Sequence, residues 1–408
     1  MSVDGSGPPP DVTGGATDIT SSHDATGDVV IRLDDVTSRA GDGTAPVRGL
    51  SLDVRRGELL ALVGPPGCGT STVLRLVNRL VEASAGSVLL DGRDVAGTDA
   101  VQLRRGIGFA SRPGGLLPHQ SARAAAATVP VLQGFDAAAA RRCADEALEL
   151  VGLDPWGSGD RLPFELGRDD QQRVATARAI AAGPAVLLLD DPFGDVDPAE
   201  RLRLQADLRR VLAARPATVL LSTEDLDEAV DLADRIAVFS AGGILEQIGT
   251  PATLLSAPAN PFVLEFIGSD RGLRRLAVTP LRVEDLDQPT LLAPGDGVGY
   301  AATALELDNR SWGIVRDADT DALLGWVPRR SLTQAMRRGD EQGRVADWVQ
   351  PFGATVQRSE TLRTAFSVLL GQDLHWVPVL DGLTYVGVLT PDVVHTALRV
   401  SGSETTRP

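Results

Sequence analysis

The residues best suited to chemistry lie in one glycine-rich stretch, Gly64 to Thr72, which reads GPPGCGTST. The stretch matches every fixed position but one of G-x-x-x-x-G-K-[ST], the motif that cradles phosphate groups. Gly64, Gly67 and Gly69 let backbone N–H groups point inward, and the following helix adds positive potential at its N-terminus. With Cys68 between them, these residues predict a phosphate-binding loop.

The one exception is Thr70, which stands where the motif has its lysine. That lysine neutralises the terminal phosphates, whereas threonine carries no charge. The 39 basic residues of this chain are all arginine, so a coding bias against lysine would favour arginine here and keep the charge. We therefore predict weakened phosphate binding. Ser71, which the motif uses as a Mg²⁺ ligand, is retained.

Two regular elements must position this loop. Leu59 to Val63 is a short apolar run, typical of a buried parallel strand, and glycine and proline end it. After the loop, apolar residues recur at helical spacing, at Val73, Leu74, Leu76, Val77 and Leu80. The pattern predicts a strand, a phosphate loop and a helix in that order.

Strands and helices alternate through the following residues, which predicts an α/β fold with a mainly parallel sheet. Residues 29–62 read as short strands, and Ala85 to Val95 reads as a hairpin. The other expected elements are a helix in a small helical insert at Ala137 to Val151, helices at Asp169 to Ala182, Pro198 to Ala214 and Asp225 to Ala233, and strands at 185–191 and Thr218 to Ser222.

Beyond about Ser269 the pattern changes to an internal repeat. Residues 312–336 and 376–398 share one plan, in which a strand, an acidic turn and a second strand lead into a helix. The repeat of about 60 residues is long for a solenoid unit, so we expect a paired α+β module.

Composition limits the function. At 408 residues the chain has room for two or three domains. Its net charge of −16 argues against a nucleic-acid partner. No stretch approaches the length of a membrane span, and the polar first 28 residues predict a disordered tail rather than a signal peptide. Cys68 and Cys143 form no disulfide or metal pattern, so we expect a cytoplasmic protein.

Several motifs in order identify the family that this chain resembles. GPPGCGTSTVLRLVNRL, GLLPHQ, QQRVATARAI, LLLDDPFGDVDP, EDLDEAV and GTPATLLSAPANPFVLEFIGSDRGLRRL resemble the nucleotide-binding subunit of an ABC transporter. The resemblance is strongest to importers of the glycine betaine/proline osmoprotectant type, which carry tandem CBS domains at the C-terminus. It implies a P-loop NTPase sheet of the ABC type with a helical insert, followed by a tandem CBS-like module.

The resemblance also implies a division of the chain. We expect a tail at residues 1–28, a nucleotide-binding domain at 29–269 with its helical subdomain at about 118–183, and a linker at 270–281. Tandem CBS-like domains would span 282–400, with a tail at 401–408. In such domains a Thr and an Asp after the second strand often bind adenine nucleotides. The second repeat has Thr390 and Asp392 and the first has Pro328 and Ser331, so either ligand binding or pairing between copies is open.

At the catalytic positions of the family, the resemblance assigns several replaced residues. Asp190 fits the Mg²⁺-associated carboxylate, and Asp191 replaces the glutamate that orients the attacking water. Arg112 replaces a glutamine near the metal, and Glu224 replaces a histidine that contacts the γ-phosphate. We expect Arg112 and Glu224 to form an internal salt bridge, although each also suits an ordinary role, in a solvated loop and at a helix start.

The family's signature motif is altered as well. Gly167, Arg168 and Asp169 replace a serine and two glycines whose backbone clasps the ATP held by the opposite subunit. We expect Asp169 and Asp170 to serve as an ordinary acidic helix start, because negative charge is favoured at a helix N-terminus.

Two hypotheses about function follow. In the first, the chain is the ATP- and Mg²⁺-binding subunit of an osmolyte importer with impaired or absent hydrolysis, attached to the membrane through a permease. In the second, it is a non-catalytic subunit paired with an active homologue. A relic without a transport role is a third reading, and the sequence leaves homodimer and heterodimer open.

Overall fold

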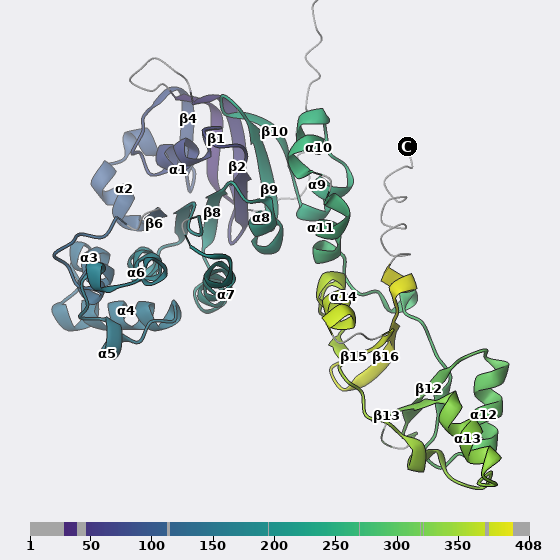
Figure 1. Ribbon diagram of the computed structural model, residues 1–408. Helices are drawn as coiled ribbons and strands as arrows, with labels where there is room; N and C mark the ends of the chain where they lie inside the picture. Colours follow the sequence, from purple (N-terminus) through teal and green to yellow (C-terminus); the bar gives the residue numbers. More distant parts are fainter. Residues whose placement is uncertain are drawn as a thin grey trace, which may run out of the picture.

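The computed structural model describes residues 28–38, 46–111, 115–194, 196–268, 270–318, 320, 322–371 and 375–394. Two sheets and their helices form the part up to residue 268, and two smaller sheets follow (Figure 1). This arrangement confirms the predicted α/β fold with an α+β module behind it. Among these described residues, no helix is long and apolar enough to cross a membrane.

The larger sheet has six strands in the order β10-β9-β3-β8-β7-β6. Their bounds are β3 Leu59–Val63, β6 Ile107–Ser111, β7 Val186–Asp190, β8 Thr218–Thr223, β9 Arg235–Ser240 and β10 Ile244–Gly249. β10 is antiparallel to β9, and the other pairs are parallel. All residues of β3 and β7 are buried because helices cover both faces, which explains their nearly unbroken apolar sequences.

A smaller antiparallel sheet lies beside it, with the strand order β2-β1-β4-β5. Its strands are β1 Val29–Ser38, β2 Val47–Arg55, β4 Ala83–Leu90 and β5 Arg93–Asp94. The predicted hairpin is the β4–β5 pair. Helix α1, Thr70–Val77, packs against both sheets, since its Leu74 and Leu76 share one hydrophobic core with Ile31 of β1 and Leu60 of β3.

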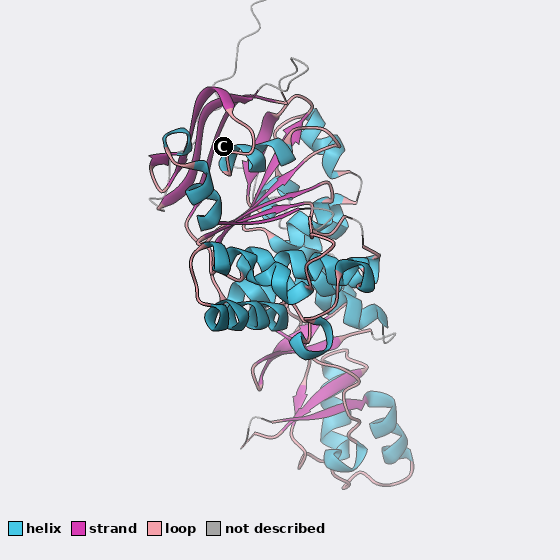
Figure 2. Ribbon diagram, turned by 90° about the vertical axis from the view of Figure 1, so that its left-hand side faces the viewer, coloured by secondary structure: helices cyan, strands magenta, loops and turns pink. Residues whose placement is uncertain are grey.

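Further helices surround the larger sheet (Figure 2). They are α2 Ala100–Gly106, α7 Pro198–Ala214, α8 Leu226–Leu232, α9 Pro251–Ser256 and α10 Pro261–Ile267. The bounds of α7 are those expected from the sequence, because Asp197 caps it. The Asp197 carboxylate accepts hydrogen bonds from the backbone N–H groups of Ala199 at 2.9 Å and Glu200 at 3.1 Å.

The helical insert lies at one end of this domain (Figure 1). It contains α3 Ala122–Leu132, α4 Ala137–Leu150, α5 Pro155–Ser158 and α6 Arg168–Ile180. Arg123 of α3 is almost fully buried and holds the insert together, since it bonds the carboxylates of Asp145 and Asp160 and the carbonyl of Pro155. The insert therefore forms one packed unit that carries the start of α6.

The C-terminal module contains two three-stranded sheets of the same topology, as the internal repeat predicts. In each, a two-residue strand pairs in parallel with the first strand of a hairpin. The elements are β11 Leu291–Leu292, α12 Val298–Leu307, β12 Trp312–Arg316, β13 Leu323–Pro328, α13 Arg329–Arg337, β14 Val356–Gln357, α14 Leu362–Gly371, β15 Val377–Asp381 and β16 Thr384–Leu389. The end of the second predicted helix lies outside the described residues.

Short 3₁₀ turns complete the described chain. They are η1 Val95–Gly97, η2 Pro163–Glu165, η3 Val283–Asp285 and η4 Val345–Trp348. η2 precedes α6, and η4 precedes β14 of the second repeat.

Helix α11, Arg271–Val278, joins the two parts of the molecule (Figure 1). Its Arg274 bonds the carboxylate of Asp227 on α8 at 2.7 Å. On the module side, its Leu276 belongs to the core that contains Leu362 of α14. A further ion pair, 3.4 Å between Arg363 of α14 and Asp231 of α8, also crosses the junction. Helix α8 is therefore attached both to α11, which leads into the module, and to α14 within it.

Candidate nucleotide site

The backbone of the glycine-rich loop has a conformation that requires its glycines. Gly67 and Gly69 have φ of 77° and 105°, in the left-handed region that side chains disfavour. A Cβ at Gly64 would lie 2.4 Å from the carbonyl oxygen of Phe239, and one at Gly69 would lie 2.3 Å from that of Pro46. The loop is thus packed closely against β9 and the start of β2. The loop thus has the compact, glycine-dependent backbone that a phosphate cradle needs.

Thr70 is the first residue of α1, directly after this cradle. Its hydroxyl oxygen lies 3.8 Å from the sulfur of Cys68, a weak S–H donor. One turn further along α1 stands Arg75, whose guanidinium pairs with the carboxylate of Asp190 at 3.8 Å. The cationic side chain of α1 next to the cradle is therefore directed at the protein's own carboxylate.

Ser71 and Asp190, the two predicted metal-associated residues, lie together. Asp190 ends β7, and its buried carboxylate accepts hydrogen bonds of 2.7 Å from the hydroxyls of Ser71 and of Ser222, the latter on β8. One hydroxyl and one carboxylate, completed by phosphate oxygens and water, are donors that fit Mg²⁺. The pair would hold Mg²⁺ next to phosphates in the cradle, and the charge of the metal would neutralise part of theirs.

Asp191 follows at the carboxyl end of the same strand. Its φ of 47° is unusual for a residue other than glycine, and its N–H donates to the carbonyl of Ser222 at 3.0 Å. Asp191 lines an open cleft of about 500 Å³ together with Thr223, Glu224 and Asp225 from the end of β8. The structure thus brings together Asp191 and Glu224, two residues predicted from distant parts of the sequence.

The cleft is rich in carboxylates. Glu224 is exposed and sits just before Asp225, the N-cap of α8. Beneath them Glu228 is buried, accepts a 2.5 Å hydrogen bond from the hydroxyl of Thr223, and lies 3.4 Å from Arg201 of α7. Burial raises the pKa of Glu228 to about 7, partly offset by the Thr223 hydrogen bond. Arg112 lies outside the described residues, so its pairing with Glu224 stays a prediction.

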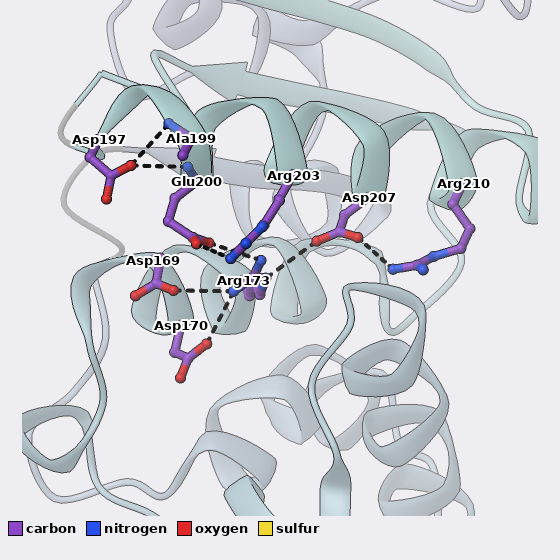
Figure 3. A network of polar contacts seen from close by, with 9 residues as sticks. All are labelled: Asp169, Asp170, Arg173, Asp197, Ala199, Glu200, Arg203, Asp207 and Arg210. Atoms are coloured by element: carbon purple, nitrogen blue, oxygen red, sulfur yellow. Dashed lines mark hydrogen bonds and ion pairs between the residues drawn. The ribbon is translucent and has the colours of Figure 1, made fainter. Parts of the chain in front are cut away.

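The altered signature segment begins α6, with Gly167 as the N-cap and Arg168 as the first helical residue. Figure 3 shows Asp169 and Asp170 directed at Arg173, one turn along α6, and each carboxylate lies 3.2 Å from its guanidinium. The acidic helix start therefore has the local role that the sequence offered as an alternative.

Arg173 also connects α6 to α7 (Figure 3). Its guanidinium lies 3.3 Å from the carboxylate of Asp207 and 3.6 Å from that of Glu200, and its side chain is only 12% exposed. Gln171, two residues earlier, donates to the carbonyl of Pro163 at 2.8 Å and so fixes the turn before the signature segment. The start of α6 is therefore fixed by α7 through Arg173 and by the preceding turn through Gln171.

A second cleft, of about 950 Å³, lies in the C-terminal module and was not predicted. The rings of Trp312 and Trp376, one from each repeat, stack with centroids 4.0 Å apart, and Trp326 meets Trp376 edge-on at 5.5 Å. Arg329, Arg330, Arg337 and His375 also line it. The first repeat's Pro328 lines this cleft. Thr390 caps the turn after β16, where its hydroxyl accepts a 3.4 Å hydrogen bond from Val393.

Comparison with known proteins agrees with this geometry. Residues 47–194 match the family model described as ABC transporter. The chain is 36% identical over 365 residues to the osmoprotectant import ATP-binding protein OsmV of Salmonella typhimurium, covering 86% of this chain and 91% of the relative. It is 32% identical to the glycine betaine/carnitine/choline transport ATP-binding protein OpuCA of Bacillus subtilis, covering 88% and 94%.

Solved structures agree as well. A dimeric post-hydrolysis structure of the ATP-binding cassette MJ0796 bound to ADP and Pi superposes with a TM-score of 0.50 at 26% identity, covering 54% of this chain and 98% of that chain. The phosphate cradle, the Ser71–Asp190 pair and these relatives lead to one conclusion. The chain belongs to the ABC transporter family, among its osmoprotectant-import ATP-binding proteins.

Proposed function

We propose that this chain is the nucleotide-binding subunit of an importer for quaternary-ammonium osmolytes such as glycine betaine, or for proline, and that its own ATP hydrolysis is impaired or absent. It would bind ATP and Mg²⁺ weakly and attach to the inner face of the membrane through a transmembrane permease. The relatives named for osmoprotectant, glycine betaine, carnitine and choline import support the transport role.

The observation that carries the proposed impairment is the missing cation at Thr70. Within one chain, a P-loop without its lysine binds the terminal phosphates only through backbone N–H groups and the metal. Arg75 does not replace that lysine, because it is paired with Asp190. We expect this loss to weaken triphosphate binding before any chemical step.

Two further residues support slow hydrolysis. Asp191 is one methylene shorter than the glutamate of the family, and a displacement of about 1 Å of a positioning group costs on the order of a hundredfold in rate. Glu224 brings a negative charge to a cleft that already contains Asp191 and Asp225, where the family has a histidine. An extra anion there repels a triphosphate.

A second function is favoured by the signature segment. Arg168 and Asp169 put two side chains where the family has bare backbone, so this chain would serve poorly as the signature donor for an active partner, whose loop already has its lysine. In this reading the chain is a structural or regulatory subunit that pairs with an active homologue, whose intact signature would serve the cradle of this chain. Co-purification of an intact ABC subunit with the chain would support it.

Domain limits belong to the same proposal. We propose a nucleotide-binding domain at residues 29–269 with its helical subdomain at about 118–183, a linker at 270–281, and CBS-like repeats at 282–400. The two sheets of equal topology in the C-terminal module support the last of these.

The test is equilibrium binding of Mg·ATP by calorimetry, with turnover measured in parallel. The wild-type chain is compared with a variant carrying Thr70→Lys, Asp191→Glu and Glu224→His, and with Thr70→Ser as a matched uncharged control. We expect the triple variant to bind at least about tenfold more tightly and to gain turnover, whereas the control changes little. Tight binding and ordinary turnover by the wild-type chain would overturn the proposed impairment.

A further inference from the structure

We propose that Arg168 supplies, from a second copy of this chain, the cation that Thr70 fails to provide. Each copy would place its Arg168 guanidinium on the triphosphate held in the glycine-rich loop of the other. This inference rests on the proposed function, since it requires that the loop holds a nucleotide and that two ABC subunits pair.

The signature segment is acidic in sequence, but both of its acids are paired within the chain. The carboxylates of Asp169 and Asp170 turn back onto Arg173 (Figure 3), and this guanidinium is largely buried between α6 and α7. Of the three consecutive charged residues that begin α6, the two acids are thus neutralised within the chain. Arg168 is therefore the charged residue of this segment that is available to contact a partner.

No side-chain contact within the described part of the chain explains why residue 168 is an arginine. It is exposed, and within the described part of the chain no hydrogen bond or ion pair joins its side chain to another residue. It is the first residue of α6, where a cation opposes the helix dipole and is mildly unfavourable. Neither packing nor local electrostatics accounts for an arginine at this position.

The charge missing from the loop and the charge left on α6 are complementary. Compared with the lysine of the motif, Thr70 lacks the positive charge and most of the length of the side chain. An arginine reaching in from outside would replace both, and its planar fork can bond two phosphate oxygens at once. Arginines supplied in trans to nucleotide phosphates act in this way in other P-loop proteins.

Arg168 cannot serve the loop of its own chain. Figure 1 shows α6 in the helical insert, apart from α1 and its loop. In a two-fold symmetric pair, Arg168 of each copy can contact the loop of the other copy, so that both loops receive a cation. The similar cassette solved as a dimer bound to ADP and Pi supports such pairing.

The test is a double-mutant cycle on the full chain with Arg168→Gln, Thr70→Lys and both. The readouts are Mg·ATP affinity, by fluorescent-nucleotide titration, and nucleotide-dependent dimerisation, by analytical ultracentrifugation. We expect Arg168→Gln alone to weaken nucleotide binding about 10- to 100-fold and to abolish the dimer. In the Thr70→Lys background the same change should cost less than about threefold, because the lysine supplies the charge in cis.

Two controls sharpen the result. Arg161→Gln removes another exposed arginine of the insert and should leave binding unchanged. Wild-type affinity should rise with protein concentration, while that of Thr70→Lys should not. An unchanged affinity in Arg168→Gln, or an equal loss in both backgrounds, overturns the inference. Ordinary turnover by the wild-type chain would overturn the proposed impairment alone and leave this cycle interpretable.

Discussion

Glu228 illustrates how a single buried side chain makes this protein sensitive to pH. Its carboxyl is buried below the acidic cleft, near Asp225 and Asp191, with Arg201 and Thr223 as its favourable partners. Its pKa in the folded state is about 7, against an ordinary value of 4.5. Between these values the folded protein keeps a proton that the unfolded chain releases. The free energy of unfolding therefore falls as the pH rises from about 4.5 to 7.

We predict that Glu228→Gln removes this fall. The variant should match the wild type near pH 4.5 and be more stable by about 1–3 kcal/mol at pH 8, because glutamine keeps the hydrogen bond to Thr223 without the buried charge. Urea unfolding at several pH values measures the difference. Glu149→Gln, on the exposed face of α4, is the matched control and should leave the slope intact. Parallel wild-type and Glu228→Gln curves would contradict the prediction.

Also at the residue scale, the Ser71–Asp190 pair predicts a metal effect. Ser71→Ala removes one hydroxyl that bonds Asp190 and would contact Mg²⁺. Nucleotide affinity measured with Mg²⁺ should then fall by about tenfold, while affinity measured with EDTA should change little. Ser222→Ala is the control, because its hydroxyl bonds the same carboxylate from β8. Equal losses with and without the metal would exclude the ligand role of Ser71.

At the scale of elements, the contact between α6 and α7 depends on Arg173. Removing its charge takes the shared cation from Asp169 and Asp170 and, among the described residues, leaves Asp207 paired only with Arg210. We predict that Arg173→Gln lowers the free energy of unfolding by about 2–4 kcal/mol, measured by chemical denaturation. Arg210→Gln is the control, since Arg210 is half exposed, pairs with one carboxylate, that of Asp207, and otherwise donates to the carbonyl of Leu150, so its loss should cost less than about 1 kcal/mol.

The elements themselves were largely predictable. Apolar runs fixed β3 and β7, and Asp197 with Pro198 marked the start of α7, because strand burial and helix capping act over a few neighbouring residues. The sequence does not show that the carboxylate of Asp169 turns back onto Arg173. The position of the Arg173 guanidinium depends on its contact with Asp207 of α7, which is distant in the sequence. The aromatic cleft escaped prediction for a related reason: Trp312 and Trp376 meet across two repeats.

At the scale of the whole molecule, α11 determines how the C-terminal module is attached. Leu276 is buried in the module core, whereas Leu273 on the same helix is 62% exposed. We predict that Leu276→Ala loosens the junction at a cost of about 2–4 kcal/mol, while Leu273→Ala costs less than about 0.5 kcal/mol. Limited proteolysis should then cut the first variant faster between residues 268 and 280. Equal cleavage rates would contradict the assigned role of Leu276.

The stacked indoles have a practical consequence for anyone who follows this protein by fluorescence. Of its five tryptophans, Trp312, Trp326, Trp348 and Trp376 belong to the C-terminal module. The remaining one, Trp156, is 83% exposed on the helical insert. Four indoles thus report on the module and one on the helical insert, and the two sheets that hold the phosphate loop contribute no indole signal. Melting curves recorded by emission and by far-ultraviolet circular dichroism will separate if the two halves lose structure at different temperatures.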